Sequence, residues 1–162
     1  MILFNTMKLN DIPRLVKAHT SLSESDKRFY HPCRMTPWHI YPFLMELYTM
    51  SKFSKYTIAL TAIDYPWKIL MGFLFLRKRN GHCELGIVVN PLCRNLDIGK
   101  MLIYRATEYA KAVDIDKIWL RVMKDNYNAV RLYLSTGFRK LKTTNKVYNG
   151  EVREFYEMEL IV

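Results

Sequence analysis

Residues 90–100 read NPLCRNLDIGK and have the residue types of a loop that binds an anion. The segment follows the apolar run LGIVV, which is typical of a strand, and leads into a stretch with helical periodicity. A helix that begins after a strand presents unpaired N–H groups and the positive end of its dipole to a ligand. Arg94 adds a forked guanidinium that suits phosphate oxygens. Many strand–helix loops share these features, so the loop alone fits either phosphate binding or a purely structural turn.

The wider sequence predicts an α/β fold. Strands are expected over 2–9, 56–63, 68–76, 82–89 and 117–123, with two more around the Asn-Gly pair at 149–150. Helices are expected over about 12–19, over 37–53 with an interruption or kink at Pro42, over 98–113 and over 126–138. The strand–helix–strand unit at 82–123 should form a parallel strand pair, because such crossovers join parallel strands.

Two stretches together resemble the GNAT superfamily of N-acetyltransferases. VVNPLCRNLDIGKMLI (88–103) is similar to its motif A, V-x-P-x-x-R-G-x-G-I-G-x-x-L, and NYNAVRLYLSTGF (126–138) is similar to its motif B. The positions in register are Val89, Pro91, Arg94, Ile98, Gly99 and Leu102 in motif A, and Asn126, Ala129, Leu132, Tyr133, Gly137 and Phe138 in motif B. The resemblance covers nearly the whole chain and is most specific over 82–138.

Asn95 and Asp97 stand where the family usually has glycine. Asn tolerates left-handed backbone angles and can replace glycine there. The Asp97 carboxylate could cap the helix, and so occupy N–H groups that a pyrophosphate needs. Alternatively it points to solvent while the backbone serves the ligand, and Arg94 and Lys100 offset its charge. We favour the second arrangement because the rest of both motifs is intact.

The resemblance implies one GNAT-like domain over 1–162, with a mixed sheet of about six or seven strands. This sheet would be mostly antiparallel with a central parallel pair, flanked by about four helices. The implied reaction moves an acetyl group from acetyl-CoA to an amine by direct attack in a ternary complex, without a metal. The strand after the helix would splay away to leave a cleft for the thioester. Contacts to acetyl-CoA would come from backbone groups of Ile87, Val88 and Val89, from the pyrophosphate loop Arg94, Asn95, Leu96, Asp97, Ile98, Gly99 and Lys100, and from Asn126, Ala129 and Tyr133.

Amine acetylation requires proton transfers, because an alkyl amine with a pKa near ~10.4 is free base in only about one part in ~2,500 at pH 7. Glu84 is the predicted base, since a carboxylate among apolar strand residues is unusual; its alternative role is a salt bridge to a neighbouring strand. Tyr133 is the predicted proton donor to the leaving thiolate, and its alternative role is core packing. His31 and His82 are second-rank bases.

The composition limits the partners. The chain has 162 residues, is 50% hydrophobic and carries a net charge of +10, yet it has no recognised nucleic-acid motif or basic tail, so nucleic acid is not the expected partner. It has no apolar run of membrane-spanning length and no signal peptide. Cys33, Cys83 and Cys93 have no C-x-x-C spacing and fit free thiols in a reducing cytoplasm.

The acceptor remains open among a protein N-terminus, a lysine side chain and a small amine, and so does homodimer formation. The expected pocket walls are the aromatic segment 24–42 and the basic hairpin 143–152. These walls offer few carboxylates, which argues against a highly cationic acceptor such as a polyamine. The alternative function is a catalytically inactive GNAT-fold module that binds CoA for regulation.

Overall fold

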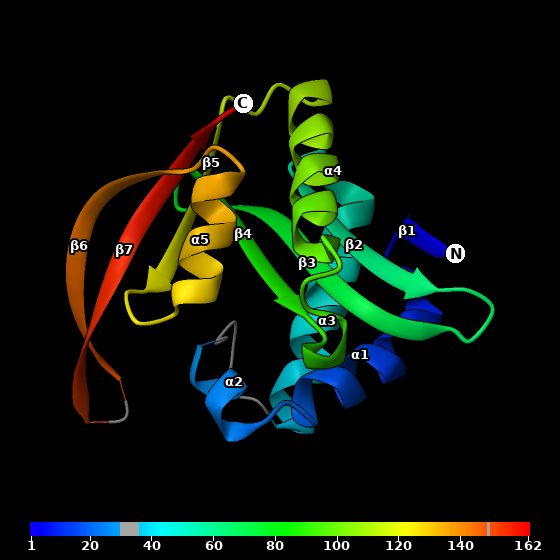
Figure 1. The fold of residues 1–162 in the computed structure, drawn as a ribbon. Coiled ribbons are helices and arrows are strands. Elements are labelled where there is room, and N and C mark those ends of the chain that lie inside the picture. Colours follow the sequence, from blue (N-terminus) through cyan, green and yellow to red (C-terminus); the bar gives the residue numbers. More distant parts are fainter. Residues whose placement is uncertain (30–35, 149) are drawn as a thin grey trace.

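One seven-stranded sheet organises the computed structural model, which describes residues 1–29, 36–148 and 150–162 (Figure 1). The strand order is β1-β2-β3-β4-β5-β7-β6. The strands are β1 (Ile2–Thr6), β2 (Thr57–Asp64), β3 (Ile69–Arg79), β4 (His82–Val89), β5 (Lys117–Met123), β6 (Arg139–Tyr148) and β7 (Glu151–Ile161). The helices are α1 (Ile12–Thr20), α2 (Glu24–Phe29), α3 (Pro37–Phe53), α4 (Ile98–Ala112) and α5 (Tyr127–Ser135), and short 3-10 helices cover Leu9–Asp11 and Pro91–Cys93. The predicted α/β class with a mixed, mostly antiparallel sheet is confirmed.

Helices cover both faces of the sheet. Helices α4 and α5 pack on one face, where Leu102 and Tyr133 join a core with Leu74 and Leu120. Helices α1 and α3 pack on the other face, where a second core contains residues such as Leu44 and Phe73. Strand β3 contributes to both cores with alternate residues, which explains why its sequence is apolar throughout.

The parallel pair β4–β5 is the feature that shapes the site. Strand β4 pairs with β3 along its whole length, from Arg79↔His82 to Gly72↔Val89. It pairs with β5 only at Cys83↔Ile118 and Glu84↔Trp119. Beyond these two pairs the strands diverge, so the predicted parallel crossover and the predicted splay of β5 are both confirmed.

Three local predictions differ from the structure. The first strand ends at Thr6, because residues 9–11 turn into a 3-10 helix in which Asp11 N–H bonds to the Lys8 carbonyl at 2.9 Å. Helix α3 runs through Pro42 without interruption. Helix α2 was not predicted, since none of its residues is buried and the sequence therefore has no apolar face to detect. Among the described helices, none is long and apolar enough to cross a membrane.

Candidate active site

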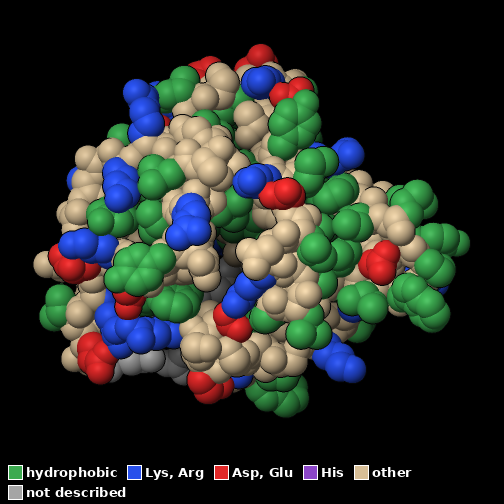
Figure 2. Space-filling view, viewed as in Figure 1, with side chains coloured by type: hydrophobic (Ala, Val, Ile, Leu, Met, Phe, Trp, Pro, Cys, Tyr) green, Lys and Arg blue, Asp and Glu red, His purple; other side chains and the backbone are tan. Residues whose placement is uncertain are grey.

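The loop before α4 forms a cradle of backbone donors. Cys93 N–H bonds to the Asn90 carbonyl at 2.8 Å, and Met101 N–H bonds to the Asp97 carbonyl at 3.0 Å. Between them, the N–H groups of residues 95–100 donate to no acceptor in the described parts of the chain. Figure 2 shows a hollow on this face of the molecule, between α5 and the loop that leads into α4, with Lys and Arg side chains around it. Unpaired donors at a helix start suit a phosphate oxygen, and this donor set therefore fits the pyrophosphate of CoA.

The two residues that replace glycine in this loop adopt glycine-like angles. Asn95 has φ 64° and Asp97 has φ 54°, both in the left-handed region. The Asp97 side chain makes no capping hydrogen bond and is 71% exposed, and its Oδ1 lies 3.0 Å from Lys100 Nζ. The arrangement in which the carboxylate points to solvent is therefore confirmed, and the N–H groups of the first turn stay available.

Gly99 lies where α4 and α5 pack against each other. A Cβ atom at residue 99 would meet the Leu132 Cδ2 atom at 2.8 Å. Helices α4 and α5 thus approach closely at this point, and a larger residue at 99 would displace the end of the Leu132 side chain.

Arg94 is held from outside the loop. Its Nη2 donates to Asp26 of α2, and Ser23 Oγ donates to the other carboxylate oxygen at 2.7 Å. Burial raises the pKa of Asp26, but the hydrogen bonds from Arg94 and Ser23 outweigh this and leave it below its ordinary value. This contact was not predictable from a local pattern, because Asp26 and Arg94 lie on separate elements. The remaining guanidinium N–H groups can still turn toward a phosphate.

Helix α2 also has a second anchor. Arg28 Nη2 donates to Asp125 Oδ2 at 2.6 Å, and Asp125 lies in the loop between β5 and α5. The two ion pairs tie α2 to the loops that follow β4 and β5.

The cleft edge of β4 is the predicted pantetheine site. Ile87, Val88 and Val89 pair with β3 on one side and lie beyond the last pair that β4 makes with β5. Their other side therefore faces the cleft. Backbone groups on such an edge can bind an extended chain with amide groups, as pantetheine is.

Of the motif B residues, Asn126 caps α5, Ala129, Leu132 and Tyr133 lie on its first two turns, and Gly137 and Phe138 follow its end. The Asn126 side chain caps this helix by accepting a hydrogen bond from Ala129 N–H at 3.3 Å, so Ala129 N–H is not available to a ligand. Tyr133 is 8% exposed, its ring packs against Phe138 at 5.6 Å, and its hydroxyl has no hydrogen bond to a described residue. Burial raises the pKa of Tyr133 above its ordinary value.

Glu84 lies at the point where β4 and β5 separate. Its Oε2 accepts a hydrogen bond from Arg77 Nε at 3.0 Å, and Arg77 is itself buried between the rings of Phe43 and Phe75. The salt bridge to a neighbouring strand, which was the alternative role, is thus present. Glu84 Oε1 has no partner among the described residues, so this atom remains available to a substrate or water.

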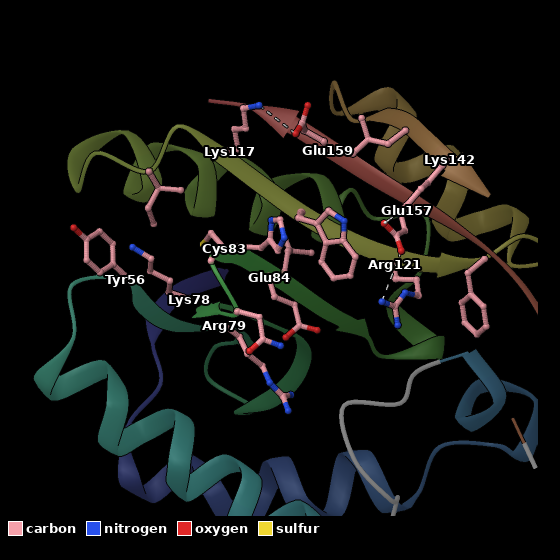
Figure 3. A pocket seen from close by; sticks show the side chains of 18 of the residues that line it. Tyr56, Lys78, Arg79, Cys83, Glu84, Lys117, Arg121, Lys142, Glu157 and Glu159 are labelled. Carbon is pink, nitrogen blue, oxygen red and sulfur yellow. Dashed lines mark ion pairs between the residues drawn. The ribbon is translucent and has the colours of Figure 1, made fainter. Parts of the chain in front are cut away.

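A pocket of about 1170 Å³ lies on the face of the sheet opposite α4 and α5. Its lining includes Glu84 and Leu85 of β4 and Trp119 and Arg121 of β5, so it reaches the cleft between the two strands from behind. Figure 3 shows Glu84 and Arg121 pointing into this space. The sheet thus separates a donor-lined loop on one face from an open pocket on the other, and β4 and β5 diverge between them.

The pocket walls differ from the prediction. Of the segment 24–42, Phe29 lines the pocket, whereas Trp38 and Tyr41 are exposed elsewhere and residues 30–35 lie outside the described residues. The hairpin contributes Lys146 and Val147. The described part of these walls adds no carboxylate to the pocket, in line with the expectation of few, whereas strands β4 and β7 add Glu84, Glu157 and Glu159.

The remaining candidate residues are two histidines and three cysteines. His82 lines the pocket and its ring lies 5.9 Å from Trp119, so it can contact an acceptor. Cys83 and Cys93 are buried free thiols, and burial raises the pKa of Cys83 to about 11. His31 and Cys33 lie outside the described residues. Within the described ranges, no cluster of three His, Cys, Asp or Glu side chains could hold a metal ion.

The chain matches a known family and several solved structures. The model of the acetyltransferase (GNAT) family matches residues 21–138. No curated protein matches the chain. Solved structures with the same fold include a GNAT-family acetyltransferase from Streptococcus pneumoniae, with 20% identity, 100% of both chains covered and a TM-score of 0.79.

Two further structures come from enzymes with named acceptors. The spermidine N-acetyltransferase from Vibrio cholerae, in complex with CoA and spermine, has 20% identity over 99% of this chain and 95% of that one, with a TM-score of 0.78. The ribosomal-protein-S5-alanine acetyltransferase from Vibrio fischeri has 13% identity over 99% of this chain and 92% of that one, with a TM-score of 0.83. At these identities the similarity extends to the fold alone.

Proposed function

The chain belongs to the GNAT family of acetyltransferases, and from that premise we propose that it acetylates a primary amine by direct attack within a ternary complex. Acetyl-CoA supplies the activated acetyl thioester when bound. One observation carries the proposal: β4 and β5 diverge between the donor-lined loop on one face of the sheet and an open pocket on the other. Acetyl donor and acceptor can therefore meet at the cleft from opposite faces of the sheet.

The donor side would be held mainly by the backbone. The unpaired N–H groups of residues 95–100 and the Arg94 guanidinium would bind the pyrophosphate, and the cleft edge at 87–89 would bind the pantetheine amides. The Asn126 side chain still has its NH₂ donors, because only its oxygen caps α5. This arrangement would place the thioester near Tyr133 and near the point of divergence at Glu84.

The acceptor side would supply the base. Glu84 Oε1 would take the proton that the ammonium or the attacking amine loses, directly or through one water. The ion pair with Arg77 holds the other carboxylate oxygen and so fixes the direction of Oε1. As the amine nitrogen bonds to the acyl carbon, the C–S bond breaks and the thiolate requires a donor.

Tyr133 would provide that donor. Because burial raises the pKa of Tyr133, its hydroxyl keeps its proton at neutral pH. A thiol has a pKa around ~8.5, below that of this phenol, so complete proton transfer is uphill and the hydroxyl acts first as a hydrogen-bond donor to the sulfur. Such a contact grows stronger as negative charge develops, which is what lowers an activation barrier.

The family indicates an amine acceptor, and we take no specific amine from any single similar structure. The Vibrio structures are named for spermidine and for an alanine of ribosomal protein S5, so the same fold serves small and macromolecular acceptors. We also propose that residues 1–162 act as one domain. The buried free thiols Cys83 and Cys93 support a reducing compartment such as the cytoplasm.

The test is acetyl transfer itself. The protein is incubated with acetyl-CoA and pooled amines, thiol release is followed, and acetylated products are identified by mass spectrometry. Initial rates with both substrates varied should give intersecting double-reciprocal lines, as a ternary complex requires. Parallel lines, or an acetylated enzyme isolated without acceptor, would contradict direct attack; an inactive protein that still binds CoA would favour the regulatory alternative.

A further inference from the structure

We infer that the acceptor amine carries an anionic group, as an acidic peptide or an amino acid does, and that it is not a polycation. This inference rests on the proposed N-acetyl transfer and adds the chemical class of the acceptor. It comes from the charges that line the acceptor pocket, which we define as the pocket of about 1170 Å³ described above.

The carboxylates on the floor of the acceptor pocket are already neutralised. Glu84 pairs with the buried Arg77, and the two glutamates of β7 each contact two basic side chains. Figure 3 shows Glu159 beside Lys117 and Glu157 beside Arg121. An ammonium group entering the pocket would have to displace these partners. The pairs on β7 are Glu157 with Lys142 at 3.4 Å and Arg121 at 3.9 Å, and Glu159 with Lys117 at 3.6 Å and Arg139 at 3.7 Å.

Most acidic side chains elsewhere in the chain are also paired with a basic group. Every acidic side chain except Glu46 and Asp116 forms an ion pair with a described basic group. Of these two, only Asp116 lines the acceptor pocket. The pocket therefore offers a polyamine a single carboxylate without a described basic partner.

Basic side chains in the acceptor pocket are in excess. Lys78, Arg79 and Lys146 line it, and none of them forms an ion pair with a described residue. Lys78 Nζ lies 4.5 Å from the centre of the Tyr56 ring, a contact that leaves its charge uncompensated. In a protein with a net charge of +10, these cations should attract an anionic acceptor and repel a polycation.

The experiment uses acceptors that differ only in charge. The first series consists of three peptide amides with a free amino terminus. They begin with Ala-Glu-Glu, Ala-Gln-Gln or Ala-Lys-Lys and are otherwise identical in sequence. A second series is γ-aminobutyrate against γ-aminobutyramide, with spermine as the polycation. The acidic member should have kcat/KM about tenfold above its neutral match, and the basic members should be poorest. This ratio should shrink as salt is added, because exposed charges are screened.

Variants of the acceptor pocket connect the preference to its cations. Arg79→Glu and Lys146→Glu should each reduce the acidic-to-neutral ratio several-fold. Lys17→Glu makes the same charge change at an exposed position of α1, outside the pocket, and should leave the ratio unchanged. Equal rates across a series, or preference for Ala-Lys-Lys or spermine, would overturn the inference while acetyl transfer stands. No acetylation of any amine would overturn the proposed function and the inference with it.

Discussion

Replacing Asp97 tests whether the loop before α4 binds pyrophosphate through its backbone. Asp97→Asn removes the negative charge and keeps a residue that tolerates its φ of 54°. Asp97→Gly removes the charge and also the left-handed strain, and no capping bond is lost because the side chain makes none. Both variants should bind CoA more tightly than the wild type.

The expected gain can be estimated from Coulomb's law. A unit charge about 6 Å from a phosphate in a solvated site is worth roughly 0.7 kcal/mol per phosphate charge. Lys100 lies 3.0 Å from the Asp97 carboxylate and offsets part of this, so removing the charge should gain about 0.5–1 kcal/mol, or roughly two- to fivefold in Kd. The exposed pair with Lys100 adds little to stability, about 0.3–0.5 kcal/mol, so neither variant should unfold.

Asp114 supplies a matched control. It is also an aspartate with positive φ, 58°, and pairs with a lysine, Lys55, at 3.8 Å. It lies past the opposite end of α4, roughly 22 Å along the helix axis from Asp97. Calorimetric titration with CoA at low and physiological salt should show tighter binding for both Asp97 variants, mostly at low salt, and no change for Asp114→Asn. Unchanged or weaker binding by Asp97→Asn would refute a pyrophosphate site at this loop.

Three further perturbations probe the proton transfers and the core. Tyr133→Phe should keep CoA affinity and lower turnover by about 10²–10⁴-fold, whereas wild-type turnover would leave Tyr133 a packing residue only. Glu84→Gln should remove the ion-pair partner of the buried Arg77 and lower the free energy of unfolding by about 1–3 kcal/mol. It should also abolish the acidic limb of the rate–pH profile. A loss of stability with an unchanged acidic limb would make the role of Glu84 purely structural. Burial lowers the pKa of His19 despite its hydrogen bond with the Leu15 carbonyl, so the unfolded chain gains a proton near pH 6.5 before the native state does. Urea unfolding should therefore show the free energy of unfolding falling by up to about 1.4 kcal/mol per pH unit as the pH drops below this value. A free energy of unfolding that does not change with pH in this range would contradict the argument.

The sequence predicted the parts of the fold that depend on local pattern. The Asn80-Gly81 turn has φ values of 50° and 80°, as the hairpin signature requires, and the crossover between β4 and β5 is parallel. The left-handed backbone at Asn95 was also predictable, because Asn accepts angles that other side chains rarely adopt.

Contacts between distant elements could not be predicted in this way. The Arg94–Asp26 pair joins a loop to a helix that has no buried residue, so periodicity gives no sign of either partner. The space beside Gly99 is taken by Leu132 of another helix, which a local pattern does not reveal. The pairing of Glu157 depends on strand register between β5, β6 and β7, and register is a property of the assembled sheet.

Calorimetry with CoA on Arg94→Glu tests the central claim, that this loop holds the acetyl donor, most directly. Asp26→Asn is the control, because it breaks the same ion pair and keeps the guanidinium. The wild type and Asp26→Asn should bind CoA, and Arg94→Glu should lose binding by tenfold or more, as expected where a phosphate contact becomes a repulsion. If the wild type gives no heat at ~1 mM CoA, or if Arg94→Glu binds as tightly as the wild type, the loop does not hold the acetyl donor.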